Sequence, residues 1–217
     1  MNIFAIPFMT NIPRELIELI IFIPIIATIV SIGRYLLGLK TLSIYAPIIL
    51  AIGIKLTGLK YGLIITTFVI IVSIIGHELL KKIRMHYITR VATNYIILAS
   101  FIIVTLLLLS ILPININIIK DINPIGLILI ATLSDSFIKM YVKKNLIASI
   151  RSLLETTVIA ITGWYIISSA SITNWLINNI WVVAVLILIN LLLGQYTGFR
   201  LKEVFRFGGI KKDDRNK

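Results

Sequence analysis

The sequence has no cysteine and little charge for its length. Lys, Arg, Asp and Glu together make up 14% of its 217 residues, whereas a water-soluble domain needs about a quarter to cover its surface. The lack of cysteine excludes disulfides, thiolate metal sites and thiol catalysis. The low charge, with 59% apolar residues and a mean hydropathy of +1.03, excludes a cytosolic enzyme, a secreted scaffold and a disordered chain. We therefore predict an integral membrane protein.

The common signatures of catalytic sites are also missing. His77 and Glu78 begin like the zinc-binding helix of a metalloprotease, but Lys81 stands where the second histidine ligand should be. There is no G-x-S-x-G turn for a serine nucleophile and no glycine-rich phosphate loop. We expect no metal site and no cofactor, and nothing in the sequence indicates an enzyme. His77 is interpreted as a polar residue near a helix end.

Long apolar runs recur along the whole chain, each close to the roughly 20 residues that cross a ~30 Å hydrocarbon core. They predict seven transmembrane helices, at 15–33, 41–57, 61–80, 93–112, 124–142, 150–168 and 174–194. Pro47 and Gly53 make the second a candidate for a kinked or partly re-entrant segment. The predicted fold is an all-α integral membrane protein, a bundle of seven helices over 15–194, with a short external segment at 1–14 and a basic cytoplasmic tail at 195–217.

The basic residues predict the orientation of this bundle. The formal charge is +12, and a soluble chain this basic would suggest nucleic acid. In a membrane protein the same residues are topology signals and lipid anchors, so we expect lipids and no nucleic acid as partners. The connections after spans one, three and five, the span ends beside them and the C-terminus together hold 17 Lys and Arg, against 4 on the other side. Because cytoplasmic loops retain positive charge, the N-terminus is predicted outside and the C-terminus inside.

Four charged residues lie within the hairpin that spans five and six should form around Asn145. Asp135 and Glu155 are each ten residues from this turn, and Lys139 and Arg151 are each six residues from it. The acids should therefore form one layer and the bases another, roughly 6 Å nearer the cytoplasm. Charges in a span are costly and usually have a reason. This cluster is our candidate binding site.

Two interpretations of the cluster remain open. It is either a structural zipper in which each base neutralises an acid and locks the hairpin, or a hydrated cavity that binds a cation, a proton or a small zwitterion. The first is compatible with a membrane scaffold. The second predicts a small permease that uses Asp135 and Glu155.

Several motifs resemble a known family of bacterial membrane domains. The run Gly38-Leu39-Lys40-Thr41, then Ala46-Pro47, and the run Leu154-Glu155-Thr156 are similar to its motifs. The closing segment 193–207, Leu-Gly-Gln-Tyr-Thr-Gly-Phe-Arg-Leu-Lys-Glu-Val-Phe-Arg-Phe, is similar to its ending. The family is a seven-transmembrane domain usually fused to an inactive transglutaminase-like domain. The chain departs from it in Gln195, where a basic residue is expected, in Asp135, where Glu is expected, and in lacking the soluble part.

The resemblance implies an uncharacterised multi-pass protein of the bacterial cytoplasmic (inner) membrane. It also implies a role beside a soluble peptide-ligase-like or transglutaminase-like partner in peptide or amino-acid modification, and it supplies no catalytic residues. On this basis we expect a membrane scaffold. The candidate docking surface is in the closing motif and comprises Gly194, Tyr196, Thr197, Gly198, Arg200, Glu203 and Arg206.

Overall fold

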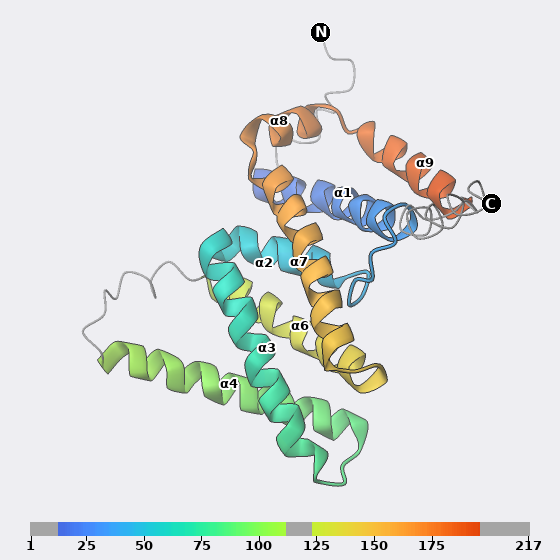
Figure 1. Cartoon of the computed structure of the whole chain (residues 1–217). Coiled ribbons are helices and arrows are strands. Elements are labelled where there is room, and N and C mark those ends of the chain that lie inside the picture. The colour runs from blue at the N-terminus through green and yellow to red at the C-terminus, as the bar shows by residue number, and fades with distance from the viewer. Residues whose placement is uncertain (1–12, 112–122, 196–217) are drawn as a thin grey trace, which may run out of the picture. The chain divides into compact units, whose positions relative to one another are not determined.

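The computed structural model describes residues 13–111 and 123–195, and every regular element in these ranges is an α-helix (Figure 1). Residues 1–12, 112–122 and 196–217 lie outside the described residues. All of the closing motif except its first residues therefore lies outside them too. The prediction of an all-α membrane protein is confirmed.

Five of the described helices are long and apolar enough to cross a membrane. They are α1 (Arg14–Tyr35), α3 (Leu59–Lys81), α4 (Tyr87–Ile111), α6 (Pro124–Lys143) and α7 (Leu146–Ser168). Each covers a span predicted from the sequence, with ends that differ by up to six residues. The largest difference is at α4, which begins at Tyr87 and so includes Arg90, a residue predicted to lie in the preceding connection.

The second predicted span contains a short helix, α2 (Ala46–Thr57), of 12 residues. At 1.5 Å per residue it is about 18 Å long, which is well short of the ~30 Å hydrocarbon core. The helix ends at Thr57. The next residue, Gly58, has a φ of 80°, which only glycine adopts readily, and α3 begins directly after it.

The seventh predicted span is broken in two. Helix α8 (Ala170–Asn178) and helix α9 (Val182–Gln195) meet at an angle of 95°, so they count as one span only if a broken helix is accepted. The described residues therefore contain five or six candidate spans, and the predicted count of seven is not confirmed. Trp175 and Trp181, which flank this bend, are about half exposed.

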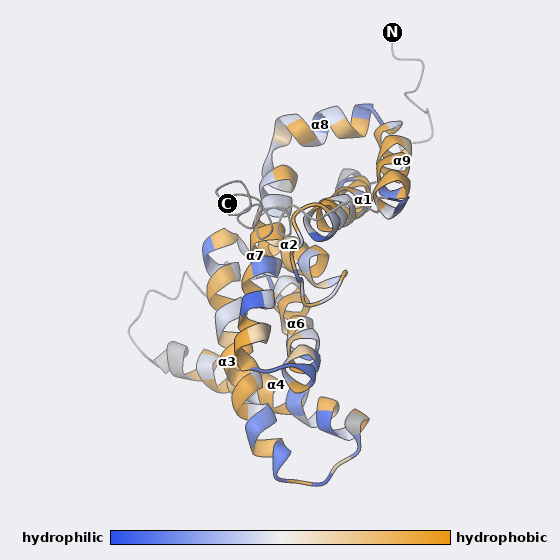
Figure 2. Ribbon diagram, turned by 45° about the vertical axis from the view of Figure 1, so that its right-hand side comes forward, coloured by the Kyte–Doolittle hydropathy of each residue, from blue (hydrophilic) through white to orange (hydrophobic). Residues whose placement is uncertain are grey.

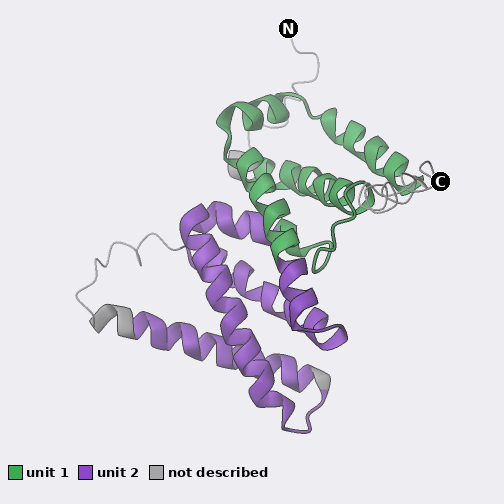
Figure 3. Cartoon of the chain, viewed as in Figure 1, with its two compact units in different colours: residues 1–48, 154–217 green, residues 49–153 purple. Residues whose placement is uncertain are grey.

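The chain divides into two compact units, which are described separately (Figure 3). Unit 1 comprises 1–48 and 154–217. In it α1 packs against α8 and α9. Asn190 of α9 donates a hydrogen bond of 2.6 Å to the hydroxyl of Thr28, which in turn donates to the carbonyl of Pro24 within α1. These two bonds connect α9 to the middle of α1.

Unit 2 comprises 49–153, and in it α3 packs against α4 and α6. Glycines lie at its tightest contacts. A Cβ atom on Gly126 of α6 would lie 2.7 Å from Thr57 and 3.0 Å from Leu56, both on α2. A Cβ atom on Gly53 of α2 would lie 2.8 Å from Ile130 of α6. Small residues at such crossings let helix backbones approach closely in a membrane.

The predicted turn at Asn145 is present between α6 and α7. Helix α6 ends at Lys143 and α7 begins at Leu146, and the Asn145 side chain accepts a hydrogen bond of 2.8 Å from the backbone N–H of Ala148. Asn at this position satisfies a free N–H group of the first helical turn. Hydrophilic residues also gather where α3 ends and the chain turns towards α4 (Figure 2).

Candidate functional site

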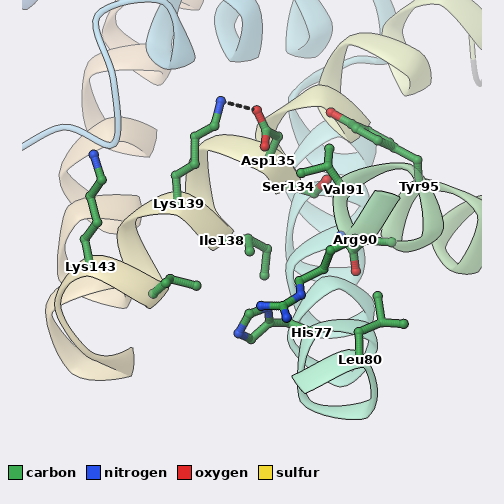
Figure 4. A pocket seen from close by; sticks show the side chains of 12 residues that line it. His77, Leu80, Arg90, Val91, Tyr95, Ser134, Asp135, Ile138, Lys139 and Lys143 are labelled. Atoms are coloured by element: carbon green, nitrogen blue, oxygen red, sulfur yellow. Dashed lines mark ion pairs between the residues drawn. The ribbon is translucent and has the colours of Figure 1, made fainter. Parts of the chain in front are cut away.

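A cavity of about 320 Å³ in unit 2 lies among α3, α4 and α6. We call it the α3/α4/α6 pocket (Figure 4). It lies near the C-terminal ends of α3 and α6 and the N-terminal end of α4, which is the end of the helices flanked by basic residues. Its lining residues are His77, Leu80, Arg90, Val91, Asn94, Tyr95, Ser134, Asp135, Ile138, Lys139, Val142 and Lys143.

Two residues of the predicted charged cluster, Asp135 and Lys139, meet in this pocket. Lys139 Nζ lies 2.6 Å from Asp135 Oδ2, one helical turn away on α6 (Figure 4). The two side chains remain 52% and 24% exposed, respectively. The pair therefore neutralises the acid while leaving both groups at the wall of the cavity.

Three polar atoms of the pocket have no partner. Among the described residues, the buried atoms Arg90 Nε, Asn94 Oδ1 and Ser134 Oγ form no hydrogen bond. Asn94 as a whole is 7% exposed and Ser134 is 0% exposed. Buried polar groups in folded proteins are normally paired, and leaving one unpaired costs about 1–3 kcal/mol. Each such group needs an explanation, and a bound water, ion or ligand is one.

His77 forms part of the pocket wall and is held by its neighbours on α6. Its ring packs edge-on against Tyr141, with centroids 5.3 Å apart, and Tyr141 donates a hydrogen bond of 2.7 Å to Glu78. Glu78 also lies 3.9 Å from Lys81. These contacts connect the ends of α3 and α6. Within the described ranges, no three His, Asp or Glu side chains gather closely enough to hold a metal ion.

Glu155 has a different setting, in unit 1. Its carboxylate accepts a hydrogen bond from the backbone N–H of Lys40, and the next residue, Thr156, accepts one of 3.0 Å from the backbone N–H of Leu42. Two motifs noted in the sequence, 38–41 and 154–156, are thus adjacent in the fold. Glu155 and Thr156 hold the extended segment that follows α1. Arg151, exposed on α7, does not line the α3/α4/α6 pocket.

Sequence reasoning missed the contribution of α4. Arg90 and Asn94 are one turn apart and so share a face of the helix, yet Arg90 was assigned to a connection and Asn94 was not considered. The signal was available as an i,i+4 polar pair at the start of an apolar run. What the sequence could not reveal is that this face meets α6 at Ser134 and Asp135.

These observations define the class of the protein: a multi-pass α-helical membrane protein with a polar pocket at the basic end of three helices. A comparison with protein families matches residues 1–211 to the family of seven transmembrane helices usually fused to an inactive transglutaminase. The chain belongs to this family, and the resemblance seen in the sequence is confirmed. No curated protein and no solved structure matches the chain.

Proposed function

We propose that this domain is a membrane scaffold that anchors and positions a transglutaminase-like or peptide-ligase-like protein, without catalysing a reaction itself. The observation that carries the proposal is the family: its members usually have this membrane domain fused to a transglutaminase-like domain that is inactive. An inactive domain retained beside a membrane domain is better suited to binding than to catalysis. In this proposal the transglutaminase-like domain acts through contact with the membrane domain, whether it belongs to the same chain or to another.

In the proposed arrangement the domain crosses the bacterial inner membrane seven times, with α2 and the α8–α9 pair each counted as one irregular span. The N-terminus is outside and the C-terminus inside. The 17-to-4 imbalance of basic residues supports this orientation. Broken helices are tolerated in membranes where other helices or a cavity satisfy their backbone groups.

Reporter fusions test the orientation. We expect a reporter in 82–86 or after Lys217 to be cytoplasmic and one in 113–119 to be external, because α4 alone separates the first and third positions. A further reporter in 36–45 tests whether α2 counts as a span. With 82–86 cytoplasmic and α3 crossing the membrane, this reporter should be cytoplasmic if α2 crosses and external if it does not. A cytoplasmic reading at 113–119 would contradict the orientation.

The docking surface is proposed at the closing motif, with Gly194, Tyr196, Thr197 and Gly198 as its start and Arg200, Glu203 and Arg206 as its charged residues. Replacing both Arg200 and Glu203 by Ala in one variant should weaken capture of a purified transglutaminase-like domain by the membrane protein. The matched control replaces Lys211 and Asp213, which are also one base and one acid but lie beyond the motif. Equal capture by both variants would contradict the docking surface.

A second candidate function is a small permease for a peptide-derived or zwitterionic solute. The observation that favours it is the α3/α4/α6 pocket, which includes Asp135 and unpaired buried polar atoms. If Asp135 lines a solute pathway, Asp135→Asn alone should impair complementation of a gene deletion while the protein inserts normally.

The matched control for this test is Glu78→Gln, an acid near the end of α3 that does not line the pocket. Replacement of Asp135, Lys139, Arg151 and Glu155 together by apolar residues is the stronger test. Full complementation by that quadruple variant would leave the scaffold as the better proposal.

A further inference from the structure

The α3/α4/α6 pocket combines apolar and cationic walls. Leu80, Val91, Ile138 and Val142 contribute apolar surface, while Arg90, Lys139 and Lys143 contribute positive charge. A ligand that fits such a site has an anionic group attached to an apolar body. We propose that the pocket binds the phosphate headgroup of an anionic phospholipid, with the start of an acyl chain against the apolar wall.

The charges of the pocket favour an anion. Three cationic residues line it against one acid, Asp135, which is already paired with Lys139 at 2.6 Å. Neither Arg90 nor Lys143 forms an ion pair within the described part of the chain. Because a cation would be repelled by both, the net charge of the pocket selects a negatively charged ligand.

The unpaired atoms fit the oxygens of a phosphodiester with a hydroxylated headgroup. Arg90 Nε and the Ser134 hydroxyl can donate to the non-bridging phosphate oxygens, and such charge-assisted bonds are the strong ones. Asn94 Oδ1, which packs against Gly76 of α3, is an unpaired acceptor for a headgroup hydroxyl. Phosphatidylglycerol carries both features. Phosphatidylcholine carries neither a net charge nor a hydroxyl donor in its headgroup.

The position of the pocket favours a lipid over free phosphate. It lies at the basic ends of three membrane helices, and basic pockets between such helices bind anionic headgroups in other membrane proteins. Its apolar wall would contribute nothing to the binding of inorganic phosphate. Free phosphate shares the same recognition chemistry, so the experiment must separate the two sources.

The test uses the full chain, purified in a zwitterionic detergent. Binding of phosphatidylglycerol, phosphatidylcholine and inorganic phosphate is measured by native mass spectrometry, with thermal stability as a second readout. We expect phosphatidylglycerol to be retained and to raise the unfolding temperature, and the other two probes to do neither. Arg90→Gln should weaken phosphatidylglycerol binding by about tenfold, the effect of losing one charged hydrogen bond.

The matched control is Arg84→Gln, which removes the same charge from an exposed position between α3 and α4, outside the lining of the pocket. It should bind phosphatidylglycerol like the parent. If Arg90→Gln does not fold, Lys143→Gln at the exposed end of α6 takes its place. Equal loss in the pocket and control variants would mean non-specific surface attraction and would overturn the proposal. Equal binding of the two lipids would also overturn the proposal. The same holds if inorganic phosphate raises the unfolding temperature as much as phosphatidylglycerol does.

Discussion

The main polar contacts of the two units differ, although each unit holds one exception: Thr41 Oγ1 is buried and unpaired in unit 1, and Tyr141 bonds Glu78 across two helices of unit 2. In unit 1 polar side chains make long-range bonds: Glu155 and Thr156 accept from the backbone at Lys40 and Leu42, and Asn190 donates to Thr28. In unit 2 the helices approach through glycines, and the polar atoms at Arg90, Asn94 and Ser134 remain unpaired beside a cavity. A polar residue in a span therefore does not by itself indicate a binding site, because the fold supplies some of these residues with a partner and others with none.

The largest loss of stability is expected at the crossing of α2 and α6 in unit 2, where there is no space for an added methyl group. In Gly126→Ala the new methyl group would lie 2.7 Å from Thr57 and 3.1 Å from the carbonyl oxygen of Gly53, so α2 and α6 must move apart. Overpacking of this kind costs about 1–3 kcal/mol. Thermal unfolding in detergent should show a clear loss of stability. Gly194→Ala is the control, since nothing lies within 4 Å of its Cβ position, and an equal loss there would contradict the close crossing.

The next effect tests the buried polar bond of unit 1. Thr156 is 0% exposed, and Thr156→Val would leave the buried N–H of Leu42 without its acceptor, at a cost of about 1–2 kcal/mol. Thr162→Val serves as the control on the same helix, because the Thr162 hydroxyl is exposed and bonds only within its own turn. Equal unfolding temperatures for the two variants would mean that the segment after α1 is held by other contacts.

A smaller effect is expected at Glu155, whose bond to Lys40 lies in an exposed setting. Glu155→Leu should cost about 1 kcal/mol, the net value of one hydrogen bond, and should speed proteolysis between 36 and 45. Glu155→Gln keeps an oxygen that can accept from the same N–H and should resemble the parent. If Gln were as damaging as Leu, the negative charge itself would be required, as the permease proposal demands.

The smallest effect is expected at Ser134, where the hydroxyl has no partner to lose. Ser134→Ala should leave stability roughly unchanged or raise it slightly, because burying an unpaired hydroxyl is unfavourable. The same substitution at Ser73, also 0% exposed, removes a bond of 2.6 Å to the carbonyl of Val69 and should be destabilising. A reversed order would show that Ser134 is paired in the membrane, which would weaken the comparison between the two units.

Much of the fold was predictable because crossing a bilayer leaves a strong mark on sequence. Five spans were located from apolar runs, and the turn at Asn145 was placed correctly. The predictions were less successful at 41–57 and 174–194, where apolar content persists through a helix break. Hydropathy measures the solvent that a segment prefers, and it does not report where backbone hydrogen bonding stops.

The candidate site was only partly predictable. Sequence spacing along one helix brought Asp135 and Lys139 together, since residues four apart share a face. Symmetry about the hairpin placed Asp135 and Glu155 at equal distances from the turn, but Asp135 pairs with Lys139 in unit 2 and Glu155 bonds the backbone of Lys40 in unit 1. Counting residues along a hairpin gives depth, whereas the neighbour of a side chain also depends on rotation of each helix about its axis.

The sequence by itself determined that this is a basic, helical membrane protein of a recognisable family, because composition and apolar run length decide which solvent a chain must occupy. Only the tertiary structure decided which polar residues meet. It assigned Glu155 to the backbone after α1 and brought Arg90 and Asn94 of α4 beside Ser134 and Asp135 of α6. The physical reason is that hydrophobicity has no direction, whereas hydrogen bonds and ion pairs act over a few ångströms and depend on how helices pack.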